Sequence, residues 1–226
     1  MRKIVIAIDG PAASGKSTTA KLVAVRLGYL HIDTGAMYRA ITLRVLEEGI
    51  SLEDVDSIKR VAKQTKVRLE RTGHTNRVLL DGRDVTKEIR SRDVTRSVSA
   101  ISSYQPVRDV LVREQRRMAR DGGVVLEGRD IGTVVLPGAD LKIYIIASAG
   151  ERATRRKKEL ELSGTIVDRQ VLEGEILERD RKDTTRAASP LQKAADAIEL
   201  DTSSLTIEEQ VEFVIAKAKE IIQQRP

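Results

Sequence analysis

The segment from Gly10 to Ser17 reads GPAASGKS and fits the pattern G-x-x-x-x-G-K-[S/T] of a loop that binds nucleotide phosphates. In such a loop, glycine lets backbone N–H groups close around the phosphates, and the following helix adds partial positive charge. Lys16 can reach the β- and γ-phosphates, and the Ser17 hydroxyl can ligate Mg²⁺. The residues expected to contact the nucleotide are Gly10, Pro11, Ala12, Ala13, Ser14, Gly15, Lys16, Ser17 and Thr18. The alternative is a glycine-containing turn with a solvated lysine.

Arginines in three later segments could bind a second anion. Arg39 and Arg129 each follow an expected strand, and ligands of open α/β folds bind at the carboxyl ends of the strands. Arg179, Asp183 and Arg186 have the spacing i, i+4, i+7, which predicts a shared helical face. Converging guanidinium groups indicate an anionic ligand beside the loop. Each arginine could instead be a solvated or ion-paired surface group.

Few other residues have the chemistry of a metal site. Asp33 could be a carboxylate behind the ligands of the magnesium ion, or the N-cap of a helix. His31 and His74 are far apart and lack ligand spacing, so we expect ordinary residues rather than metal ligands. The absence of cysteine excludes a disulfide, a thiolate metal site and a cysteine nucleophile.

Short apolar runs rich in β-branched residues predict the strands that position these groups. The expected strands cover residues 4–8, 29–33, 124–126, 141–146 and 197–200. After the glycine loop, a helix that ends at Gly28 is predicted by the spacing of Ala20, Val23, Ala24 and Leu27. Strand, loop, helix and strand form a βαβ unit, so we expect an α/β fold with a five-stranded, doubly wound parallel sheet. Thr206 and Glu209 have the spacing of a capping box and predict the start of the last helix.

One region departs from the βαβ pattern. The segment VRLERTGHTNRVLLDGRDV, residues 67–85, predicts a β-hairpin around Gly73 and Asn76. We interpret it as part of an insert at about residues 64–100. The core would comprise residues 1–63 and 101–226, within a single domain of residues 1–226.

The composition limits the classes of partner. A net charge of +6 and a pI near 9.6 permit a nucleic-acid surface, but aromatic residues make up only 2% of the chain and offer few stacking platforms. A cleft that holds several phosphates explains the excess charge better, so we expect no nucleic-acid partner. No apolar run approaches the ~20 residues of a membrane helix. We expect a soluble, cytoplasmic monomer without a signal peptide or membrane contact.

Taken together, these segments resemble the bacterial cytidylate kinases, a family of P-loop nucleoside monophosphate kinases. The motifs that carry the resemblance, in the order and spacing of the family, are IDGPAASGKST, DTGAMYRA, EGRDIGTVVLPGADLKIYI, ERDRKDTTRAASPL and ADAIELDTSSLTIEEQV. The resemblance implies that ATP with Mg²⁺ donates its γ-phosphoryl group to CMP or dCMP, within pyrimidine nucleotide metabolism. It also implies a short helical lid at about residues 151–168.

The resemblance further implies a role for individual residues. Arg39 and Arg129 would grip the acceptor phosphate and act in catalysis with Lys16. Ser99, Arg108 and Asp130 would read the cytosine, although Asp130 could instead orient Arg129. The other implied substrate contacts are Thr34, Arg179, Asp183 and Arg186. The lid arginines that would close over the phosphoryl group are Arg152, Arg155 and Arg156.

Two further classes of function are compatible with the loop. A nucleotide-dependent switch or RNA-associated NTPase would agree with the loop and the basic pI, but no guanine-selecting N-K-x-D element is evident. A kinase for another monophosphate or small metabolite is the closer alternative.

Overall fold

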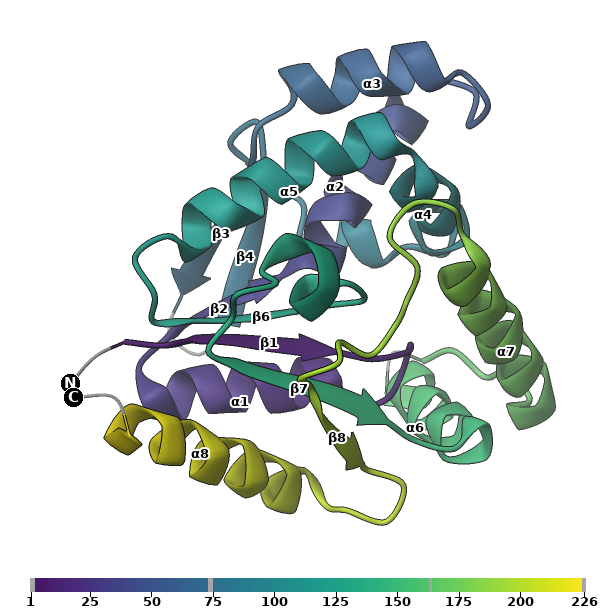
Figure 1. The fold of residues 1–226 in the computed structure, drawn as a ribbon. Helices are drawn as coiled ribbons and strands as arrows, with labels where there is room; N and C mark the ends of the chain where they lie inside the picture. Colours follow the sequence, from purple (N-terminus) through teal and green to yellow (C-terminus); the bar gives the residue numbers. More distant parts are fainter. Residues whose placement is uncertain (1–2, 73–74, 163, 225–226) are drawn as a thin grey trace.

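A parallel sheet forms the centre of the protein (Figure 1). The structure, a computed structural model, describes residues 3–72, 75–162 and 164–224. The five strands of the sheet lie in the order β2-β6-β1-β7-β8. They are β1 (Val5–Asp9), β2 (Leu30–Asp33), β6 (Val124–Gly128), β7 (Leu141–Ile146) and β8 (Ile198–Asp201). All four strand pairings are parallel, so the expected α/β fold and five-stranded parallel sheet are confirmed.

Helices cover both faces of this sheet. One face packs against α1 (Lys16–Leu27) and α8 (Ile207–Gln224), and the other against α2 (Thr34–Glu47) and α5 (Gln105–Ala119) (Figure 1). Side chains of β1 alternate between the two cores: Ile6 and Ile8 pack on the α1 side, and Ala7 packs on the α2 side. Both faces are therefore buried, which explains the continuous apolar runs of these strands.

Capping residues mark the end of α1 and the start of α8 where the sequence predicted them. The backbone of Gly28 adopts a left-handed conformation (φ 68°) directly after α1, as expected for a glycine that ends a helix. Thr206 and Glu209 form the predicted capping box: Glu209 Oε2 accepts from Thr206 N at 2.8 Å, and Thr206 Oγ1 accepts from Glu209 N at 3.3 Å.

The insert contains three antiparallel strands, β3 (Val67–Thr72), β4 (Thr75–Leu80) and β5 (Arg83–Asp84). The predicted hairpin of β3 and β4 is confirmed, and its turn at residues 73–74 lies outside the described residues. The third strand was not predicted. Its signal is the Asp81–Gly82 pair, where both residues have positive φ, as in the two-residue turns that match the twist of a hairpin.

The insert packs against α2 and leads into two neighbouring helices. Val78 and Leu80 of β4 form a small core with Ala36 and Ala40 of α2. A 3₁₀ turn, η1 (Glu88–Arg90), and α4 (Arg92–Ser103) return the chain to α5, while α3 (Val55–Gln64) precedes the insert and packs on α5. The boundaries expected for the insert, residues 64–100, stay a prediction.

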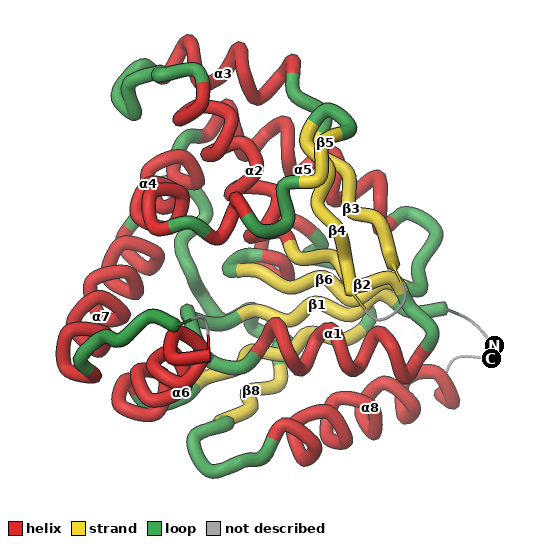
Figure 2. Tube along the Cα trace, turned by 180° about the vertical axis from the view of Figure 1, so that it is seen from behind, coloured by secondary structure: helices red, strands yellow, loops and turns green. Residues whose placement is uncertain are grey.

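Two helices form a separate pair beside the sheet. The helices α6 (Ala149–Leu162) and α7 (Arg169–Thr185) lie side by side (Figure 2). Ala153, Leu172 and Ile176 form their small shared core, which also packs against Ala13 of the glycine loop. The lid boundaries expected at residues 151–168 stay a prediction. Among the described helices, none is long and apolar enough to cross a membrane.

Candidate active site

The glycine loop connects β1 to α1 and has the backbone that its sequence requires. A Cβ on Gly10 would lie 2.2 Å from the carbonyl oxygen of Ile145, and Gly15 has a φ of +91°. Only glycine fits both positions. Lys16 begins α1, is buried, and donates from Nζ to the carbonyl oxygen of Pro11 at 3.1 Å. Burial, with the nearby positive charge of Arg129, lowers the pKa of Lys16 to about 7.

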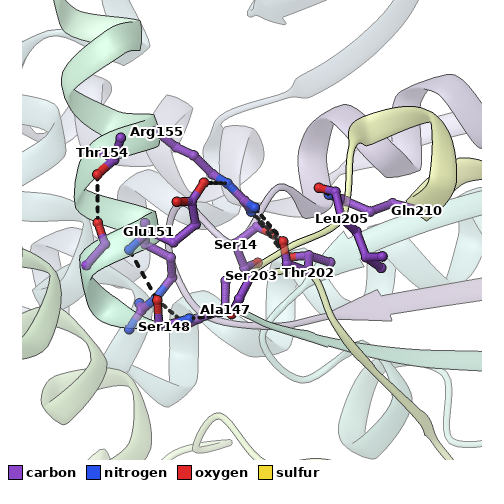
Figure 3. A network of polar contacts seen from close by, with 12 residues as sticks. Ser14, Ala147, Ser148, Glu151, Thr154, Arg155, Thr202, Ser203, Leu205 and Gln210 are labelled. Atoms are coloured by element: carbon purple, nitrogen blue, oxygen red, sulfur yellow. Dashed lines mark hydrogen bonds and ion pairs between the residues drawn. The ribbon is translucent and has the colours of Figure 1, made fainter.

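Arginines of α6 hold the outer side of this loop. Arg155 donates to the carbonyl oxygen of Ser14 at 3.2 Å and to that of Thr202 at 2.5 Å (Figure 3). Arg152 donates to the carbonyl oxygen of Ala12 at 3.3 Å. In a trans peptide the N–H points away from the carbonyl oxygen, so the N–H groups that follow Ala12 and Ser14 face away from these arginines. Such an arrangement suits a loop whose N–H groups bind phosphate.

In this structure, Arg152 and Arg155 thus bind backbone carbonyl oxygens of the glycine loop, and Arg155 also binds that of Thr202. Arg152 also pairs with Asp180 of α7 at 2.6 Å. Arg156 pairs with Glu159 at 2.6 Å. That these three residues close over a phosphoryl group stays a prediction.

Glu127 is a site residue that sequence reasoning missed. It is the penultimate residue of β6 and is 2% exposed. The Ser17 hydroxyl donates to its Oε2 at 2.5 Å, and His31 Nε2 lies 3.0 Å from its Oε1. Burial acts to raise the pKa of Glu127, but His31 and the charge of Lys16 outweigh it and hold that pKa below its usual value. Its signal in the sequence was a carboxylate at the end of an apolar strand, beside Asp33 on the neighbouring strand.

Asp33 caps α2. Its Oδ1 accepts a hydrogen bond from Ala36 N at 3.0 Å, which is the geometry of the predicted N-cap. Burial, followed by the nearby charge of Glu127, raises the pKa of Asp33. The two carboxylates end paired strands, with Asp33 in register with Glu127. The metal alternative for Asp33 stays a prediction, and His74 lies outside the described residues.

Arginines from several elements converge near Lys16. Arg129 Nε pairs with Asp183 of α7 at 2.8 Å, while Arg39 Nη1 of α2 donates to Thr95 Oγ1 at 2.8 Å. Burial lowers the pKa of Arg39 and of Arg179 to about 10 each, and repulsion by neighbouring arginines, including Arg129, acts in the same direction. The buried Nε of Arg179 makes no hydrogen bond within the described part of the chain. This concentration of positive charge suits an anionic ligand.

Asp130 lies between two arginines, neither of which is Arg129. Its Oδ2 accepts from Arg108 Nη2, and its Oδ1 lies 3.8 Å from Arg186 Nη2. Arg108 is 1% exposed, and its guanidinium also lies over the ring of Tyr38, 5.4 Å from its centroid. Tyr38 was not singled out in the sequence. Asp130 and Arg108 thus come together as the resemblance implied, although they are 22 residues apart in the chain.

The remaining expected residues have simpler surroundings. Thr34 Oγ1 donates to the carbonyl oxygen of Glu127 at 2.7 Å. Ser99 of α4 is partly buried, and among the described residues its hydroxyl makes no hydrogen bond. Thr18 is exposed on α1. The helix α7 ends at Thr185, so Arg186 does not share a helical face with Arg179 and Asp183 as its spacing predicted.

A loop with the phosphate-binding pattern, beside buried arginines near the carboxyl ends of parallel strands, is typical of P-loop phosphotransferases. The fold is found in a solved structure. A gluconokinase from Sinorhizobium meliloti 1021 has a similar fold, with a TM-score of 0.51, 16% identity and 100% of each chain covered. At this identity the likeness shows the fold alone.

Sequence comparisons show the family. Residues 6–220 match the family model for cytidylate kinase. A cytidylate kinase from Pelotomaculum thermopropionicum is 53% identical over 94% of each chain, and one from Bacillus pumilus is 50% identical over 92% of each chain. The chain belongs to the cytidylate kinase family. The resemblance inferred from its motifs is confirmed.

Proposed function

We propose that the chain transfers the γ-phosphoryl group of ATP to CMP and dCMP, giving CDP or dCDP and ADP. Its relatives carry the name cytidylate kinase over nearly the whole length of this chain. The observation that carries the proposal is the position of Arg129: it directly follows β6, and Glu127 of that strand accepts a hydrogen bond from Ser17 of the loop. The charges of Arg129 and Arg179 also act to lower the pKa of Lys16. A donor loop and an acceptor site that share one electrostatic environment suit direct transfer between two phosphates.

Alignment and charge stabilisation account for the chemistry. The acceptor phosphate is mostly dianionic at neutral pH, because its second pKa is near ~6, so no strong general base is needed. Lys16 would stabilise charge on the donor phosphates, while Arg39 and Arg129 would hold the acceptor in line. Arg179, with Asp183 and Arg186, would bind the sugar and the neighbouring phosphate.

The residues around Ser17 fit a magnesium ion. A hydroxyl and a carboxylate are hard oxygen groups of the kind that Mg²⁺ prefers, and Ser17 and Glu127 are joined by a hydrogen bond. Ser17 would ligate the ion, and Glu127 would orient the Ser17 hydroxyl by accepting its hydrogen bond. When bound, the ion would neutralise charge on the β- and γ-phosphates.

Base selection would depend on Asp130 and Arg108. Cytosine presents a 4-amino donor beside the N3 acceptor, whereas uracil presents a carbonyl acceptor beside an N–H donor. Asp130 would accept from the amino group, and Arg108 would donate to N3 or the 2-carbonyl. Ser99 and Thr34 would complete the acceptor site. A mismatched base would leave buried polar groups unpaired, which penalises it strongly.

Closure of the α6–α7 pair would exclude water from the phosphoryl group. Arg156, whose charge is near Arg39 and Arg179, is the residue of the lid best placed to meet the phosphates. A monomeric state and a cytoplasmic location stay predictions.

The test is a coupled assay of ADP formation with CMP, dCMP, UMP, AMP and GMP as acceptors. We expect efficient turnover with CMP and dCMP, and far less with the purine monophosphates. The matched control is Lys16→Ala, which should lose several powers of ten in rate while staying folded. ADP formation that is independent of any acceptor would indicate an NTPase instead. An equal rate with every acceptor would refute the proposed cytosine specificity.

A further inference from the structure

Asp9 is a buried carboxylate that none of the roles above uses. It is the last residue of β1, it directly precedes the glycine loop, and it is 5% exposed. Its Oδ1 accepts a hydrogen bond from Ile131 N at 2.8 Å, and its Oδ2 accepts one from Gly132 N at 2.7 Å. Two backbone N–H groups are its hydrogen-bond partners among the described residues, and Arg129 supplies a favourable charge nearby. A buried carboxylate with these partners needs an explanation beyond packing.

The two N–H groups belong to the segment that presents the acceptor-binding residues. Arg129 and Asp130 follow β6 directly, and a single π-helical turn, η2 (Ile131–Val135), begins immediately after them. The first N–H groups of a helical turn have no partner within that turn. By accepting two of them, Asp9 fixes the direction in which the chain leaves β6. Arg129 and Asp130 are therefore placed relative to β1.

The contact between Asp9 and η2 is close. A Cβ built on Gly132 would lie 3.4 Å from Asp9 Oδ2 and 3.1 Å from Cδ of Lys142. On the other side, Asp9 is followed by Gly10, which lies tightly against Ile145. Asp9 thus connects two backbone segments that have little room to move.

We propose that Asp9 is a positioning residue that sets the acceptor site relative to the donor loop. This inference rests on the proposed role of Arg129 and Asp130 in binding the acceptor. Transfer between two phosphates depends on their separation, and a misplacement of about 1 Å can cost about 10²-fold in rate. One carboxylate bonded to η2 and joined covalently to the loop fixes that separation directly.

The carboxylate of Asp9 gives each of the two N–H groups its own acceptor oxygen. Burial raises the pKa of Asp9 to about 6, although the bonds from Gly132 and Ile131 act to lower it, so the side chain is mainly ionised at neutral pH. A carboxamide offers one acceptor oxygen and one NH₂ donor. In Asp9→Asn, one backbone N–H would therefore lose its partner or η2 would shift.

Other residues support the donor loop, so an effect of Asp9 on CMP binding can be separated from an effect on ATP binding. Arg152 holds the carbonyl oxygen of Ala12, and Arg155 and Thr202 hold that of Ser14. These contacts do not involve Asp9. Loss of the bond to η2 should therefore affect the acceptor more than ATP.

The experiment compares Asp9→Asn with the matched control Asp140→Asn. Asp140 Oδ2 accepts from Val5 N at 2.8 Å, so the control makes the same chemical change at a carboxylate that bonds the opposite end of β1, where one acceptor oxygen is sufficient. We expect Asp9→Asn to raise the KM for CMP at least tenfold and to leave the KM for ATP within about twofold. Asp140→Asn should change neither. Titration of each nucleotide by calorimetry would confirm which site is affected.

The inference is overturned if Asp9→Asn only lowers the melting temperature, as a structural bond would, or if it weakens ATP and CMP equally. If Asp9→Asn does not fold, Asp9→Glu decides the question, because it keeps the carboxylate but lengthens the connection between β1 and η2 by one methylene group; an unchanged KM for CMP would overturn the inference. A further variant, Arg129→Met, distinguishes a failure of this inference from a failure of the proposed function. If Arg129→Met leaves CMP binding intact, the acceptor assignment itself is wrong. If Arg129→Met weakens CMP binding and Asp9→Asn does not, only the inference fails.

Discussion

The hydroxyl of Ser17 donates a 2.5 Å hydrogen bond to the carboxylate of Glu127, which lies 110 residues further along the chain. Glu127 is buried near the carboxyl end of β6, and His31 Nε2 lies 3.0 Å from its other oxygen. The bond joins the first turn of α1 to the end of β6. It gives the loop serine a fixed orientation before any nucleotide binds.

Glu127→Gln tests this relationship. The amide can no longer accept equally from both partners, so Ser17 should lose its orientation toward the cation. Partners of metal ligands typically contribute about 10–100-fold to metal affinity. We expect the Mg²⁺ concentration that gives half-maximal activity to rise about tenfold, measured at saturating ATP and CMP. Glu114→Gln, on the surface of α5, is the control, and equal Mg²⁺ dependence in both variants would contradict the role of Glu127.

The lowered pKa of Lys16 predicts proton uptake on nucleotide binding. In the free protein this pKa is about 7, so at pH 8.5 most Lys16 side chains are neutral. Triphosphate favours the charged form and raises the pKa, so binding should take up close to one proton at pH 8.5. Calorimetry in buffers of different ionisation enthalpy measures the number of protons taken up per nucleotide bound. Lys16→Met should abolish the uptake, and equal uptake in both proteins would refute the assignment.

Asp130→Asn tests how cytosine is recognised. If Asp130 accepts from the 4-amino group, kcat/KM should fall about 100-fold for CMP and only a few-fold for UMP, so the ratio between them narrows. Asp109→Asn on the neighbouring surface of α5 is the control. An equal loss with both substrates would mean that Asp130 acts only by holding Arg108 and Arg186.

Arg155→Met tests the support behind the glycine loop. Its guanidinium binds the carbonyl oxygens of Ser14 and Thr202 (Figure 3), so its loss should let the loop relax. We expect the KM for ATP to rise about tenfold, with the KM for CMP within about twofold. This is the reverse of the pattern expected for Asp9→Asn. Arg169→Met, which removes an exposed ion pair of α7, is the control, and an unchanged KM for ATP in Arg155→Met would refute the role.

Local patterns were sufficient for the framework of the protein. The glycine loop, the apolar strands and the capping box of Thr206 each depend on residues that are close in sequence, and each lies where its spacing predicted. The loop motif and the segments that carry Arg39 and Arg129 also indicated the family. Local signals can be missed as well: the Asp81–Gly82 turn was sufficient to predict β5.

Only the tertiary structure decided which distant groups meet. Glu127 reaches Ser17 because β6 lies beside β1 in the sheet, and Asp9 reaches η2 for the same reason. Arg155 holds the carbonyl oxygen of Ser14 in this structure, because α6 packs against the loop, and its expected closure over the phosphates stays a prediction. A side chain's spacing fixes the face on which it lies, but its partner depends on the order of the strands and the packing of the helices. That order results from burial of the whole core, which no short segment encodes.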